Sequence, residues 1–162
     1  MILGLSISAF TTLHVIISLI GIVSGLIVVL GWLGGKTAPA LTALFLATTV
    51  LTSVTGFLFP FSAFGRPQVV GAISLVLLVV ALAALYVFHL VGAWRWIYII
   101  TATMALYLNC FVGVVQAFQK LPALQALAPT QSEPPFQIAQ IAVLAILVVL
   151  GFLAVWKFHP AR

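Results

Sequence analysis

The stretch VVGAISLVLLVVALAALYVFHLV, residues 69–91, decides the fold of this chain, since it contains no Lys, Arg, Asp or Glu. A helix needs about 20 consecutive apolar residues to cross the hydrocarbon core of a bilayer, which is roughly 30 Å thick. This stretch meets that length without interruption. It therefore predicts a transmembrane helix, with Arg66 before it and Arg95 after it.

The same pattern recurs on both sides of this stretch. The predicted spans cover residues 8–30, 40–59, 69–91, 97–118 and 137–156. All 8 prolines lie outside these spans or at their edges, where proline starts or ends a helix. We expect an all-α protein, a single transmembrane domain over residues 1–162 made of five transmembrane helices.

Composition excludes a water-soluble domain. Hydrophobic residues make up 65% of the chain and charged residues 4%, whereas about 25% of an ordinary soluble domain is charged. The formal net charge is +5, but the Lys and Arg residues are scattered and form no patch. We therefore expect contacts with membrane lipids and no nucleic-acid partner.

The loop charges predict an orientation. Five spans place the two termini on opposite sides of the membrane. One side carries four basic residues: Lys36, Arg95, Lys157 and Arg162. The other carries Arg66 and Lys120, partly offset by Glu133. Because basic residues favour the cytoplasmic side, the pattern predicts the N-terminus out and the C-terminus in.

The tryptophans support this orientation. Trp prefers the head-group region of a bilayer, and all 4 tryptophans fall on the proposed inner side: Trp32, Trp94, Trp96 and Trp156. Together with Arg95, they are predicted to anchor the bundle at the membrane interface.

Small and hydroxylated residues form helical stripes in the first two spans. Such residues let transmembrane helices approach closely and exchange weak hydrogen bonds. The predicted helix-packing residues are Ser18, Gly21, Gly25, Thr48, Thr52 and Thr55. The spacing of Gly21 and Gly25 also fits a dimer seam.

Uncharged polar residues in the outer half of the spans form a predicted ligand pocket, namely His14, Tyr107, Asn109, Gln116 and Gln140. Asn109 lies near the middle of its span, where an amide without partners is costly, so it should face other helices. Two interpretations stay open. The cluster is either a pocket for a lipophilic ligand such as a quinone, lipid or haem, or an interhelical hydrogen-bond network without a ligand.

Several chemistries lack the residues that they need. Glu133 is the sole carboxylate side chain, so there is no acid–base pair, no oxygen-rich cation site and no Ser-His-Asp triad. One Cys and three dispersed His residues give no zinc spacing. A haem between His14 and His89 is disfavoured because the two lie at opposite depths. We expect that the protein is not an enzyme and that it binds no metal. We also expect no cofactor, and the alternatives are haem or quinone.

The chain resembles small uncharacterised polytopic inner-membrane proteins of bacteria. The segments that carry the resemblance are TALFLATTVLTSVTGFLFPF (42–61), ALYLNCFVGVVQAFQKLPAL (105–124) and ALAPTQSEPPF (126–136). The resemblance implies a multi-pass protein of the bacterial inner membrane, with no assigned activity, cofactor or catalytic residue.

These observations lead to a functional expectation. We expect a non-enzymatic inner-membrane protein that acts by packing, either as an accessory or assembly subunit of a larger membrane complex or as a homo-oligomer. One alternative is a binding or redox module for a lipophilic ligand. Another is a transporter or channel for a small neutral solute.

Overall fold

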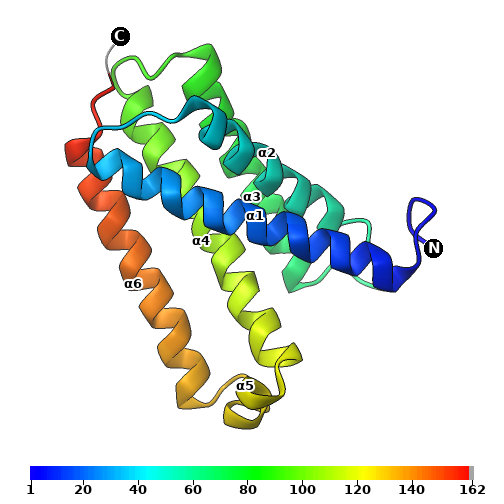
Figure 1. Cartoon of the computed structure of the whole chain (residues 1–162). Coiled ribbons are helices and arrows are strands. Elements are labelled where there is room, and N and C mark those ends of the chain that lie inside the picture. Colours follow the sequence, from blue (N-terminus) through cyan, green and yellow to red (C-terminus); the bar gives the residue numbers. More distant parts are fainter. Residues whose placement is uncertain (161–162) are drawn as a thin grey trace.

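The computed structural model describes residues 1–160 as a bundle of helices (Figure 1). The helices are α1 (Ile7–Leu33), α2 (Pro39–Gly56), α3 (Arg66–Leu82), the π-helical turn η1 (Ala83–Val87), α4 (Trp94–Lys120), α5 (Pro122–Leu127) and α6 (Pro134–Lys157). Five segments are long and apolar enough to cross a membrane: α1, α2, α3 with η1, α4 and α6. This confirms the predicted all-helical bundle. Arg162, counted above among the basic residues, lies outside the described residues.

Proline and polar residues begin the helices. Pro39 and Pro134 each occupy the first turn, where the missing N–H group costs no intrahelical bond. Ser6 caps α1 by accepting a hydrogen bond from the backbone N–H of Ala9 at 3.1 Å. The third span ends earlier than the predicted residue 91 because the backbone leaves the helix after Val87.

The two ends of the bundle differ in how they pack. We call the end with Lys36 and Arg95 the Arg95 end, and the end with Arg66 and Lys120 the Lys120 end. The buried core gathers towards the Arg95 end, where Trp32 is 2% exposed. Its ring lies edge-on to Tyr98, with centroids 5.3 Å apart, and 5.5 Å from the ring of Phe158. Helices α1, α4 and the chain after α6 therefore meet around one tryptophan.

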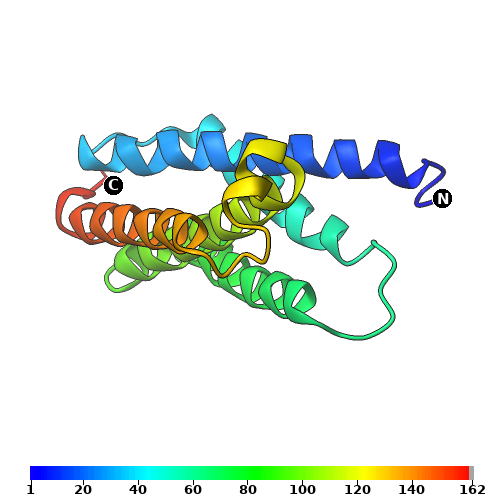
Figure 2. The same ribbon diagram turned by 90° about the horizontal axis from the view of Figure 1, so that it is seen from below.

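Towards the Lys120 end, aromatic contacts join the helices in pairs. Phe10 of α1 contacts Phe59 after α2, with ring centroids 5.0 Å apart. Phe118 of α4 contacts Phe136 of α6 at 5.4 Å. Figure 1 shows α4 and α6 running down to α5, whereas α1 runs to the N-terminus at the right. Figure 2 shows the same arrangement from below, with α6 beside α4.

The loop before α6 is held by Glu133. One carboxylate oxygen accepts hydrogen bonds from the hydroxyl of Thr130 at 2.7 Å and from its backbone N–H at 3.1 Å. The other oxygen accepts from the N–H of Ser132 at 3.1 Å. The hydroxyl of Thr130 and these backbone donors hold the pKa of Glu133 below its usual value. The short helix α5 precedes this loop.

Gly25 gives a direct test of the packing. An added Cβ there would lie 2.8 Å from Leu106 Cδ1 and 2.8 Å from ring carbons of the buried Phe45. We expect Gly25→Ala to destabilise the bundle by about 1–3 kcal/mol through overpacking. Thermal unfolding in detergent, followed by tryptophan fluorescence, measures the change.

Gly31→Ala is the matched control, because it lies on the same helix and its nearest neighbour, Lys36 Cβ, would be 3.9 Å away. We expect a gain of about 0.5–1 kcal/mol from the better helix propensity of alanine. Equal melting temperatures for the two variants would contradict the close contact at Gly25.

Candidate functional site

Asn109 joins α4 to α1 near the middle of both helices. Its side chain is 7% exposed. Asn109 Oδ1 accepts a hydrogen bond from the hydroxyl of Ser18 at 2.8 Å, and Nδ2 donates to the Ser18 carbonyl at 3.4 Å. Both ends of the amide thus have partners on one residue of α1, which offsets the cost of holding an amide in the middle of an apolar bundle.

Gly21 lies about one turn after Ser18 on α1. Because it has no side chain, α2 and α4 approach α1 closely there. A Cβ at Gly21 would lie 3.2 Å from Asn109 Nδ2 and 3.2 Å from the hydroxyls of Thr48 and Thr49. Both threonine hydroxyls donate to carbonyls of α2 itself, Thr48 to Leu44 and Thr49 to Phe45, each at 2.6 Å. The predicted packing stripe therefore lies inside the bundle, with Gly21 and Gly25 facing α2 and α4 of the same chain.

His14 contacts α2 and the loop after it. Its Nδ1 lies 2.7 Å from the hydroxyl of Thr55, which itself donates to the Leu51 carbonyl at 2.6 Å. Because that hydroxyl proton is engaged, we assign the proton of this contact to Nδ1 of His14. The imidazole also lies edge-on to Phe59 at 5.3 Å between centroids. Thr52 donates to the Thr48 carbonyl at 2.8 Å, within its own helix.

Gln140 belongs to a different contact, between α6 and α4. Its Nε2 donates to the carbonyl of Phe111 at 3.2 Å, while its buried Oε1 has no partner among residues 1–160. Tyr107 and Gln116 are half-buried on α4, and the Tyr107 ring lies 6.2 Å from that of Phe111. Three of the five predicted pocket residues thus make hydrogen bonds across three different helix pairs: His14 between α1 and α2, Asn109 between α1 and α4, and Gln140 between α4 and α6.

The predicted interfacial anchors lie at the Arg95 end in two kinds of environment. Trp96 and Trp156 are 45% and 70% exposed. Trp94 stacks on Phe88, with centroids 4.0 Å apart and the rings 3° from parallel. Trp32 is enclosed by the bundle, as described above. Arg95 donates two hydrogen bonds from Nη1, to the carbonyls of Val155 at 2.7 Å and Phe158 at 2.9 Å.

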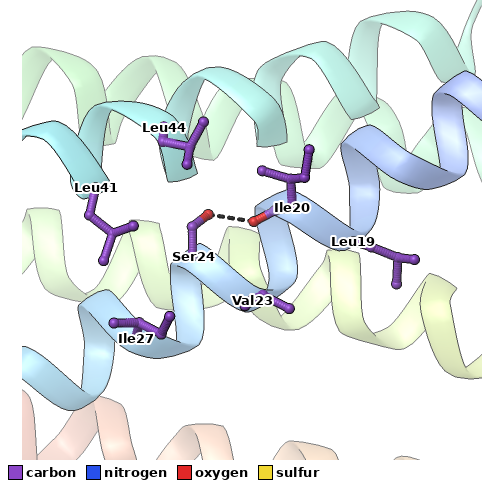
Figure 3. Close-up of a pocket in the computed structure, with 7 residues that line it drawn as sticks. All are labelled: Leu19, Ile20, Val23, Ser24, Ile27, Leu41 and Leu44. Atoms are coloured by element: carbon purple, nitrogen blue, oxygen red, sulfur yellow. Dashed lines mark hydrogen bonds between the residues drawn. The ribbon is translucent and has the colours of Figure 1, made fainter.

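The predicted pocket residues line neither of two hollows among residues 1–160. The first, about 350 Å³, is an apolar groove between α1 and α2, lined by Leu19, Ile20, Val23, Ser24, Ile27, Leu41 and Leu44 (Figure 3). The hydroxyl of Ser24 donates to the Ile20 carbonyl, so it presents no free proton to the groove. Sequence reasoning missed this groove because its residues do not differ from those of any lipid-facing surface.

The second cavity, about 500 Å³, lies at the Arg95 end and includes His89, Arg95 and His159 in its lining. The structure places these two histidines, from the turn after η1 and from the segment after α6, around one space. Among the described residues, no three His, Cys, Asp or Glu side chains are grouped to hold a metal ion.

Comparisons with known proteins found no matching family model, no similar curated protein and no similar solved structure. The structure itself defines the class of the protein: an all-helical bundle with five helices suited to span a membrane.

The Ser18–Asn109 contact predicts a measurable coupling. In a double-mutant cycle of Ser18→Ala and Asn109→Ala, we expect a coupling energy of about 0.6 kcal/mol, and at most about 1.7 kcal/mol, as for other hydrogen bonds in membrane proteins. Unfolding in mixed detergent micelles measures the four variants.

Thr52→Ala supplies the control cycle with Asn109→Ala, because the Thr52 hydroxyl bonds only within α2. Its coupling to Asn109 should be close to zero. A Ser18–Asn109 coupling no larger than that of the control would show that the hydrogen bond does not stabilise the contact.

Proposed function

We propose that the chain is a non-enzymatic membrane protein that acts by helix packing, as an accessory or assembly subunit of a larger complex of the bacterial inner membrane or as a homo-oligomer. The observation that carries the proposal is the pairing of intramembrane polar groups with one another. His14 bonds Thr55, and Asn109 bonds Ser18. Groups that are engaged in helix contacts have little capacity left for chemistry on a substrate.

Helix α6 is the face that we propose for contact with another membrane helix. In the most apolar 18-residue stretch of α6, 11% is buried, compared with 44% in that of α4. Its buried residues Gln140, Leu147 and Ala154 follow one stripe against the bundle. Ile138, Ile141 and Phe152 are each more than 60% exposed on other sides of the helix, at 66%, 64% and 63%. A protein that functions by packing needs such an unpartnered face.

Photo-crosslinking from α6 tests this proposal. In a Cys110→Ser background, the variants Ile141→Cys and Phe152→Cys are labelled with a photo-reactive maleimide in native membranes. We expect both to form the same adduct, since both side chains lie on the exposed side of α6. Mass spectrometry of the adduct distinguishes a second copy of the chain from another membrane protein.

Val76→Cys and Val79→Cys on α3 are the matched controls, because both valines are 65% exposed. They share the apolar, lipid-facing character of the α6 positions and should give no such adduct. Equal crosslinking from α3 and α6, or none from α6, would contradict a packing role for α6.

The groove between α1 and α2 supports a second candidate, the binding of a lipophilic ligand. Its volume of about 350 Å³ and its apolar lining suit an acyl or isoprenoid chain. A quinone or lipid recovered by organic extraction from protein purified in mild detergent would favour this candidate. An extract with bulk membrane lipids alone and a featureless visible spectrum would count against it.

We also propose that the N-terminus lies outside and the C-terminus inside. The tryptophans and the basic residues Lys36, Arg95 and Lys157 support this orientation, since they lie at the Arg95 end. A green fluorescent protein fused to the C-terminus should fluoresce, and alkaline phosphatase fused at the same position should be inactive. The reverse result would overturn the orientation.

A further inference from the structure

The cavity at the Arg95 end is built from three separate parts of the chain. It measures about 500 Å³ and is lined by Leu85, His89, Leu90, Gly92, Arg95, His159 and Pro160. The first four residues belong to η1 and the turn after it, Arg95 to the first turn of α4, and the last two to the segment after α6. Three hydrogen-bond-donating side chains thus meet at one helix end of the bundle.

The turn after η1 has an unusual backbone. His89 and Leu90 have φ angles of 48° and 59°, a left-handed conformation that residues with a Cβ adopt rarely. The N–H of Leu90 donates to the Ala84 carbonyl at 2.9 Å, and the N–H of Phe88 donates to that of Ala83 at 2.9 Å. Such conformations cluster at binding sites, and π-helical turns are frequent at functional sites. Here the turn brings His89 to the cavity.

Arg95 is fixed in place but keeps donors free. Its Nη1 donates to the carbonyls of Val155 and Phe158 at the C-terminus of α6. The guanidinium carries five N–H donors in a planar fork. Nε and Nη2 make no hydrogen bond to residues 1–160. A half-buried cation with unengaged donors beside a cavity is suited to bind an anion.

No carboxylate side chain competes for these donors within residues 1–160. Glu133 is the only acidic residue of the chain, and it precedes the first turn of α6, at the other end of that helix from His159. Each imidazole can donate a hydrogen bond in either protonation state. The cavity therefore combines one permanent positive charge with two further donors.

We propose that this cavity binds a phosphate group, through Arg95, His89 and His159. Two sources share this chemistry: the head group of an anionic phospholipid and free inorganic phosphate. The cavity lies at the helix ends where Trp96 and Trp156 are exposed. Because tryptophan prefers the interface of a bilayer, this end of the bundle is suited to lie at the depth of lipid head groups. Basic pockets between transmembrane helices are known to hold such head groups. Phosphate binding in this cavity requires no partner at α6.

Native mass spectrometry of the full chain in detergent tests the site. The probes are phosphatidylglycerol, phosphatidylcholine and inorganic phosphate. We expect the protein to retain phosphatidylglycerol in preference to phosphatidylcholine. The double variant His89→Ala/His159→Ala should bind phosphatidylglycerol about fivefold more weakly or worse. Lys36→Ala/Lys120→Ala, which removes two exposed charges outside the cavity, should bind it as the unchanged protein does.

The two sources give different results in the same experiment. If inorganic phosphate displaces phosphatidylglycerol, the site accepts the free anion; if it does not, the site recognises the lipid head group. Phosphatidylcholine carries its phosphate beside a cationic choline, which the Arg95 charge repels, so equal retention of the two lipids would overturn the proposed anion site. So would unchanged binding by the double variant.

A second variant guards against a folding defect. His159 lies exposed after the last helix, so His159→Ala alone should leave the melting temperature unchanged and still weaken phosphatidylglycerol binding. If His159→Ala binds this lipid like the unchanged protein, the proposed site is wrong, whatever happens to the stability of the double variant.

Discussion

The close approach of α1 to α2 and α4 at Gly21 and Gly25 is the contact on which the rest of the structure depends. Lipid chains are as apolar as the side chains of this protein, so burial alone does not drive the helices together. Dispersion contacts and a few hydrogen bonds must do so. Without a Cβ at these glycines, Phe45 and Leu106 pack directly on the α1 backbone, and Asn109 reaches Ser18 one turn away.

The hydrogen bonds of the predicted pocket residues join different pairs of helices. The core around Trp32 holds the helices at the Arg95 end, whereas aromatic pairs join them two by two towards the Lys120 end. His14 therefore finds a partner on α2, and Gln140 finds one on α4. These hydrogen bonds join neighbouring helices, which is consistent with the packing role that we propose.

The sequence was sufficient for the helices but not for their contacts. Length, apolar character and the positions of Pro39 and Pro134 predict the spans, because these properties act locally. Trp32 has the sequence context of an interfacial anchor, yet it is enclosed by Tyr98 and Phe158. That environment depends on residues more than sixty positions away. Periodicity within one helix carries no information about such neighbours.

The left-handed turn at His89 illustrates the same limit. The apolar run continues through residues 88–91, so hydropathy extends the helix, whereas hydrogen bonds of η1 and the stacking of Phe88 on Trp94 end it. Hydropathy indicates whether a segment prefers apolar or aqueous surroundings. It carries no information about how the backbone of that segment turns. Hydropathy places His89 near the end of the third span, but only the turn places it beside the same cavity as Arg95.

Arg95 connects this cavity to the proposed packing face. The last carbonyls of a helix lack intrahelical partners, and two carbonyls at the end of α6 are satisfied by the Arg95 guanidinium. An anion in the cavity would contact the same guanidinium through its remaining donors. Because one rigid, planar group serves both contacts, an occupied cavity would restrict the movement of Arg95 and thereby hold the end of α6 against α4. Arg95 thus links the proposed anion site to the end of α6.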